Sequence, residues 1–242
     1  MLKSALIAAA LALPACALAA EMSVDTAYER IETVGQQPWR ATGASLTLDE
    51  NNVLKSWGGL LQSAERYGAH ANAAEVFGVR QLASGMALEG RLFASEGADF
   101  LAKKGVEATL YAGLPAGMEL MTTLGRKLYA RDASSLLRVR LDRDFGPWRV
   151  GAGVARDLEF SEQTTFGSVK YRASTWSLGL HLAKGVEAER LESGATLRTP
   201  VRSGALAAEM EVTQNTRFRA IFTRMLTTQS RAGVSLGLVH RF

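Results

Sequence analysis

Three histidines, His70, His181 and His240, are the side chains of this sequence that could act as general bases near neutral pH. A lipid-hydrolysing site would combine a histidine with a serine nucleophile and with a group that orients the imidazole ring. None of the three stands in a His-x-Ser pair, and His70 falls in a segment that we expect to be a turn. The sequence therefore predicts no catalytic residue and no enzymatic activity.

Three aspartates that lie near one another, Asp132, Asp142 and Asp144, are the next candidates for chemistry. A barrel protease would hold such acids beside a histidine, and no histidine accompanies them. We expect them to be solvated or paired with nearby arginines, namely Arg131, Arg138, Arg140 and Arg143. No histidine, cysteine and aspartate residues cluster with metal-ligand spacing, so neither a metal nor a cofactor is predicted.

In the segments that must position these side chains, apolar and polar residues alternate with a period of two. In 136–144 (LLRVRLDRD), leucine and valine point to one side, while arginine and aspartate point to the other. The segment 145–147 is typical of a turn, and the alternation resumes in 148–155 and again in 176–183. This pattern predicts antiparallel strands with one apolar face and one polar or small face.

The alternation and the turn-like breaks between the runs predict about fourteen strands, with roughly twelve as the lower bound. Segment 187–200 has no clear pattern and is expected to be the longest loop, and 96–104 is expected to form a short helical turn. The expected strands are 22–32, 38–49, 53–66, 71–81, 84–95, 104–114, 117–129, 134–145, 147–158, 163–172, 174–185, 202–213, 215–226 and 230–242.

The length of these runs favours a membrane barrel. They match the roughly 9–11 residues with which a tilted strand crosses a bilayer, and no later segment has the roughly 18 apolar residues of a membrane helix. The predicted fold is all-β, an up-and-down antiparallel transmembrane β-barrel, with a soluble periplasmic β-sandwich as the alternative. In the barrel, the polar face would line the lumen with Glu107, Arg138, Arg140, Asp142, Arg149, His181, Arg217 and Arg219.

Aromatic residues near the ends of the runs are candidates for girdles at the membrane interfaces, with ordinary strand aromatics as the alternative. They are Tyr28, Trp39, Trp57, Tyr129 and Trp148.

The N-terminal segment has the features of a signal peptide. Lys3 precedes an apolar run at 6–13, and Pro14 ends that run. The small-x-small pattern at 17–19 predicts cleavage near residue 19 or 20, so that 1–20 is a signal peptide and 21–242 is one barrel domain. Cys16 is either discarded with the signal or acylated in a loose lipobox.

The last residues alternate in the same way and end on a phenylalanine. This resembles the terminal-strand signature of outer-membrane barrels, with His240 where an aromatic is more usual. The expected location is the outer membrane of a Gram-negative bacterium, with lipid and the barrel assembly machinery as partners. Nucleic acid is not expected, because a net charge of +4 is spread without a basic run. The signature residues are Val234, Leu236, Leu238, His240 and Phe242.

Short motifs in the first half of the chain resemble those of the YaiO family of outer-membrane barrels. They are SAERYG at 63–68, GVEATLY at 105–111, LPAGMEL at 114–120 and GRK at 125–127, the last without the tyrosine typical of the family. The resemblance implies a divergent member in the outer membrane with no established enzymatic activity, and it points to polysaccharide systems.

The sequence thus predicts a non-enzymatic barrel, either a narrow channel for small solutes or an envelope scaffold linked to polysaccharide export. An outer-membrane lipid- or peptide-processing enzyme and a soluble periplasmic binding protein remain as alternatives.

Overall fold

The computed structural model describes residues 20–33, 37–50, 55–130, 132–190, 196–226 and 230–242. Nearly all of them lie in strands, and no helix in these ranges is long and apolar enough to span a bilayer. Cys16 and all but the last residue of the expected signal segment lie in 1–19, outside the described residues.

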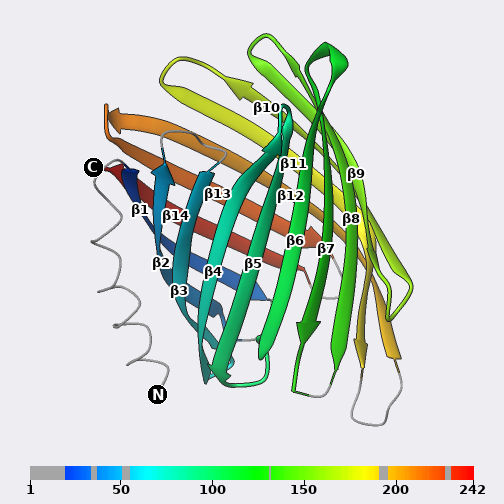
Figure 1. The fold of residues 1–242 in the computed structure, drawn as a ribbon. Coiled ribbons are helices and arrows are strands. Elements are labelled where there is room, and N and C mark those ends of the chain that lie inside the picture. Colours follow the sequence, from blue (N-terminus) through cyan, green and yellow to red (C-terminus); the bar gives the residue numbers. More distant parts are fainter. Residues whose placement is uncertain (1–19, 34–36, 51–54, 131, 191–195, 227–229) are drawn as a thin grey trace.

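Fourteen strands form one closed antiparallel barrel (Figure 1). Each strand pairs with its neighbours in sequence, and β1 also pairs with β14, so the topology is up-and-down. The strands are β1 (Ala20–Thr33), β2 (Trp39–Glu50), β3 (Lys55–Arg66), β4 (Ala69–Ala83), β5 (Met86–Gly97), β6 (Lys104–Leu114), β7 (Met118–Leu128), β8 (Ala133–Phe145), β9 (Trp148–Asp157), β10 (Glu162–Arg172), β11 (Trp176–Arg190), β12 (Thr196–Thr213), β13 (Thr216–Leu226) and β14 (Arg231–Arg241).

The predicted fold class is confirmed, and most strand boundaries agree with the alternation. Three local expectations were wrong. Most of the expected loop 187–200 is strand, because β11 continues to Arg190 and β12 already begins at Thr196. The segment 98–103 forms a hydrogen-bonded loop with no helical turn, closed by Ser95, whose backbone donates to the Lys103 carbonyl. His70 lies in β4, and the turn is formed by the two residues before that strand.

The apolar face of the barrel points outward. Leu92, Leu124 and Leu182 are 55–56% exposed although they lie in the middle of paired strands. Facing polar side chains such as Glu89 and Asp142 are 6% and 2% exposed. A soluble sandwich would show the opposite arrangement, so the sandwich is excluded and the exposed apolar band is the lipid-facing surface of a membrane barrel.

Three glycines on the inner face each lie directly opposite a phenylalanine on the next strand. The pairs are Gly58 with Phe77, Gly105 with Phe93, and Gly153 with Phe166. In each pair the ring covers the glycine so closely that an added Cβ would overlap it. The glycines therefore let three rings lie flat along the wall and leave space in the interior.

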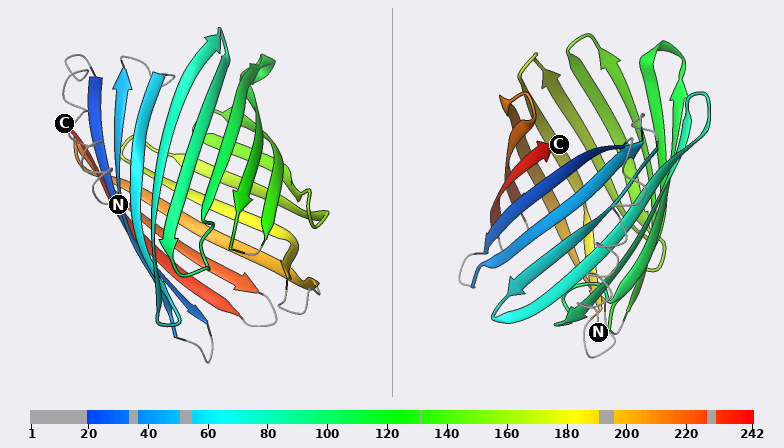
Figure 2. Two further views of the ribbon diagram at one scale, coloured as in Figure 1. Left: turned by 60° about the horizontal axis from the view of Figure 1, so that its bottom comes forward. Right: turned by 60° about the vertical axis from the view of Figure 1, so that its left-hand side comes forward.

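The two ends of the barrel differ in their connections. At the end where β1 begins and β14 finishes, several connections are tight, such as 84–85, 146–147 and 214–215. Most connections at the other end are longer, such as 98–103 and 158–161. Figure 2 shows β1 beside β14 and the strands inclined to the barrel axis. Below, the first is called the turn end and the second the loop end.

Candidate functional site

All eight residues proposed from the sequence to line the lumen occupy inward positions of the register. Arg138, Arg140 and Asp142 alternate along β8, and Arg149 is the second residue of the adjacent strand, β9. Glu107 lies on β6, His181 on β11, and Arg217 and Arg219 on β13. Some of these residues contact one another, and the others contact different side chains, as described below.

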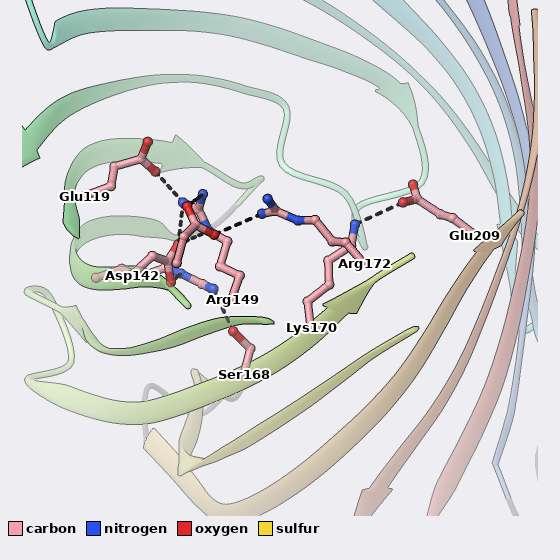
Figure 3. A network of polar contacts seen from close by, with 9 residues as sticks. Glu119, Asp142, Arg149, Ser168, Lys170, Arg172 and Glu209 are labelled. Atoms are coloured by element: carbon pink, nitrogen blue, oxygen red, sulfur yellow. Dashed lines mark hydrogen bonds and ion pairs between the residues drawn. The ribbon is translucent and has the colours of Figure 1, made fainter. Parts of the chain in front are cut away.

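Asp142 is the centre of the largest polar network, near the turn end (Figure 3). Its side chain accepts a hydrogen bond from Arg140 Nε at 2.8 Å and another from Arg149 Nη2 at 3.0 Å. Arg149 also binds Glu119 at 2.6 Å. Two arginines therefore neutralise this buried carboxylate, and the network ties β7, β8 and β9 together.

The same network continues along β10. Asp144 lies 3.4 Å from Arg149 and 3.5 Å from Arg172. Lys170 reaches Glu209 on β12 at 3.0 Å, crossing over β11 (Figure 3). At this crossing the inward residue of β11 beside Lys170 is Gly179, which leaves room for the contact.

The predicted partners of the aspartates were partly wrong. Arg140 does bind Asp142, but the second partner is Arg149, which comes from the next strand. Arg143 points outward and stacks on Phe145 at 4.5 Å. Among the described residues, Arg138 forms no ion pair with these acids, and it faces a cavity described below.

A second polar cluster lies on β4, β5 and β6. Glu89 accepts a hydrogen bond from Tyr111 at 2.5 Å and pairs with Arg91, which also binds Glu75 at 2.9 Å. Farther along, Glu107 lies 3.6 Å from Lys127. Of these residues only Glu107 was predicted to line the lumen, although the same alternation places Glu89 and Arg91 on the inner face.

Arg217 and Arg219 make separate contacts near the closure of the barrel. Arg217 binds Glu211 at 3.1 Å, and Arg219 reaches Asp25 on β1 at 2.8 Å. The latter pair crosses β14 above Gly237, where a side chain would meet the guanidinium. This ion pair thus links the two ends of the sheet, which the sequence pattern did not indicate.

The described residues line a polar and an apolar cavity inside the barrel. One, of about 710 Å³, has a polar lining that includes Glu107, Tyr111 and Arg138. The other, of about 440 Å³, has a mainly apolar lining that includes Ile31, Met225 and His181.

Arg140 and Phe166 belong to the walls of both cavities. The guanidinium carbon of Arg140 lies 5.9 Å from the centre of the Phe166 ring, and its Nη2 donates to Ser168 at 2.7 Å. This stacked pair, held in place by Asp142 and Ser168, therefore lies between the two spaces.

Two buried polar groups also line the apolar cavity. Trp39 Nε1 and Arg231 Nε are buried and have no hydrogen-bond acceptor among the described residues. Trp39, expected at a membrane interface, instead lies on the inner face against Phe100 and Arg66. Trp39 points inward because it lies directly opposite Ile31 on β1, and residues that face each other across two antiparallel strands point to the same side of the sheet. Its position near the end of a strand does not decide its direction.

The geometry of a catalytic triad is not present among the described residues. His181 lies directly opposite Ser168 on the adjacent strand, yet no hydrogen bond joins them; the Ser168 hydroxyl instead accepts one from Arg140. No group of three or more potential metal ligands is found in the described ranges.

The residues of the predicted terminal-strand signature lie on the outer face of β14 and directly after it. The three aliphatic ones are 40–45% exposed. His240 Nδ1 is 2.9 Å from the Thr216 hydroxyl, and its ring contacts Phe242 edge-on at 4.5 Å. The signature is therefore presented toward lipid; its role in assembly stays a prediction.

Comparisons with known proteins give a fold but no family. No family model and no curated protein matches the sequence. Among solved structures, the monoaromatic hydrocarbon channel CymD has a TM-score of 0.65 at 9% identity over 93% of this chain and 88% of its own. Omp33 of Acinetobacter baumannii has a TM-score of 0.59 at 9% identity over 93% and 100%. The KdgM porin in complex with oligogalacturonate has a TM-score of 0.53 at 10% identity over 91% and 99%. The chain thus shares the fold of outer-membrane channels.

Proposed function

We propose that this protein is a narrow, non-enzymatic channel of the Gram-negative outer membrane that passes small solutes. The observation that carries the proposal is the interior: cavities of about 710 and 440 Å³ share wall residues, among them the stacked pair Arg140 and Phe166. A barrel whose interior were fully packed would have no such spaces. The channel fold of the neighbours supports the same function.

The size and charge of the interior suggest the class of solute. Most inward carboxylates are paired with arginine or lysine, so the lining has no dominant charge. The polar cavity suits hydroxyl-rich molecules, since it offers both donors and acceptors. A role beside polysaccharide export and membership of the YaiO family are the finer forms of this proposal, supported by the short sequence motifs.

Single-channel recording in planar bilayers tests the channel. We expect small discrete conductance steps from the wild type. Phe166→Ala and Arg140→Ala are expected to raise the conductance at least about twofold, because each removes one half of the constriction between the cavities. Controls on the outer face are Phe222→Ala and Arg143→Ala, which remove the same side chains without touching the interior.

An envelope scaffold would give a different result. In that case the wild type and both interior variants would be electrically silent, although correctly folded. Equal conductance changes in the interior and outer-face variants would also contradict a constriction at Arg140 and Phe166.

A further inference from the structure

The outer face of the barrel carries an arc of basic residues at the loop end. Each is an exposed, outward-pointing residue at the edge of the apolar band that lies nearest the loop end. Together they extend from β6 to β13. The members of this basic arc are Lys104, Arg126, Arg156, Lys184, Arg202 and Arg224. On the described outward positions of β6 to β14 there is no acidic residue to neutralise them.

The centre of the arc brings like charges directly together. Lys184 on β11 is the register partner of Arg202 on β12, and Arg224 on β13 is diagonal to Arg202. Like charges that face each other across an antiparallel pair are destabilising, so an anion bound between them would stabilise this arrangement.

Basic residues elsewhere on the same rim are compensated within the protein. Arg30 and Arg40 are also register partners, but Arg30 binds Glu32 at 2.7 Å and Arg40 lies opposite Glu65. In the loop beside the arc, Glu159 accepts a hydrogen bond from Ser135, and within the described part of the chain it forms no ion pair with the arc. The centre of the arc is thus left for an external anion.

The position of the arc identifies the level of the membrane at which that anion would lie. At the turn end, Trp148, Tyr171 and Trp176 form an outward row with ring centres 4.9 and 5.3 Å apart, as in an aromatic girdle. From Trp176 to Lys184 is about 27 Å along the strand, or about 21 Å along the membrane normal at a tilt near 40°. The arc therefore lies at the opposite edge of the hydrocarbon layer.

The loop end is expected to face the cell exterior, because outer-membrane barrels place their short turns in the periplasm and their longer loops outside. The headgroups at the level of the arc are then those of the outer leaflet. In a Gram-negative bacterium these belong to lipopolysaccharide, whose glucosamine headgroup carries phosphates that arginine and lysine bind by charge-assisted hydrogen bonds.

We propose that Lys184, Arg202 and Arg224 form a binding site for the phosphate groups of lipopolysaccharide on the outer wall of the barrel. The site rests on the outer-membrane location proposed above, but it does not require the barrel to conduct. Its test is a binding measurement, so failure of this site leaves the conductance experiment unaffected.

Fluorescently labelled lipopolysaccharide is titrated into the purified barrel in a zwitterionic detergent. The test variant is K184Q/R202Q/R224Q. The matched control is K55Q/R80Q/R143Q, which removes three outward basic residues from the turn end and so changes the net charge equally. Heat-modifiable migration shows that each variant is folded. We expect the dissociation constant to rise at least about tenfold in the test variant and less than about threefold in the control.

Two further probes separate the sources of phosphate. Lipid A from which the phosphates have been removed is expected to bind the wild type at least about tenfold more weakly. Inorganic pyrophosphate is expected to compete only at millimolar concentration, since it lacks the acyl chains that lie along the apolar band. Equal losses in the two triple variants, or equal binding of dephosphorylated lipid A, would overturn the proposal. Should the triple variant not fold, the double variant K184Q/R224Q gives the same comparison.

Discussion

At the scale of single residues, the decisive feature is a carboxylate that is buried but fully paired. Asp142 is 2% exposed and is held by two guanidinium groups from adjacent strands. Removal of the acid would leave two arginines close together inside the barrel without their common counter-ion, which costs more than the loss of one exposed ion pair.

Asp142→Asn is therefore expected to lower the free energy of unfolding by about 2 kcal/mol, because the amide cannot neutralise Arg140 and Arg149. The measurement is the guanidinium-induced unfolding of the barrel in detergent. Asp144→Asn serves as the control: its side chain is 45% exposed, and we expect a loss below about 1 kcal/mol. If Asp142→Asn lowered the free energy of unfolding as little as Asp144→Asn does, the network would not contribute to stability.

Sequence reasoning found the inward side chains but not their partners. The alternation in 136–144 already separates Arg138, Arg140 and Asp142 from the leucines, so the face was predictable. That Arg149 binds Asp142, and that Arg219 crosses β14 to reach Asp25, depends on the register between strands, which side-chain alternation does not specify. The direction of Trp39 was missed for the same reason.

At the scale of strands, the inner wall uses glycine opposite phenylalanine as a repeated device. In each of the three pairs the ring takes the space that the glycine leaves, so the wall stays smooth beside the cavities. Gly90, on the outer face of β5, has no such ring beside it and could be exchanged without overlap.

Gly105→Ala is expected to destabilise the barrel by about 1–3 kcal/mol, because the new methyl group would overlap the Phe93 ring and approach the Arg126 carbonyl oxygen at 2.7 Å. Thermal unfolding followed by gel migration measures the effect. Gly90→Ala, on the outer face of β5 with no atom within 4 Å of the added Cβ, is the matched control and is expected to be neutral or slightly stabilising. Adding Phe93→Ala to Gly105→Ala is expected to recover part of the loss; strictly additive losses would refute the ring overlap.

The one large error in the strand prediction has a physical cause. Alternation of apolar and polar residues is imposed by lipid, whereas backbone pairing can continue beyond the lipid. The ends of β11 and β12 pair from Gly185 with Val201 to Arg190 with Thr196, past the apolar band. Pro200 fits there because β13 reaches only as far as Arg202, so the missing N–H of Pro200 interrupts no second ladder.

At the scale of the whole molecule, the exposed apolar band and the closed sheet determine behaviour in detergent and membranes. A closed barrel satisfies every strand edge internally, which is why such barrels resist denaturation by detergent until heated.

We expect the protein to fractionate with outer membranes and to migrate at two positions on a denaturing gel, one for unheated and one for boiled samples. N-terminal sequencing of the membrane form is expected to begin at Ala20 or Glu21, as the small-x-small pattern at 17–19 predicts. Recovery of the protein in the soluble periplasmic fraction, with one gel position at all temperatures, would be incompatible with the barrel. A matched soluble periplasmic protein from the same cells controls the fractionation.

The pairing of β1 with β14 sets the order in which this sheet can form. All other strand pairs join segments that are adjacent in the chain, whereas Ser23 meets Arg241 across nearly the entire polypeptide. Loop closure of that length is slow compared with hairpin formation. The growing sheet must therefore pass through an open state in which the edges of β1 and β14 are unpaired. A chaperone or a folding catalyst would accelerate folding most at the pairing of these two strands. Once β1 and β14 have paired, the Arg219–Asp25 ion pair stabilises the closed barrel.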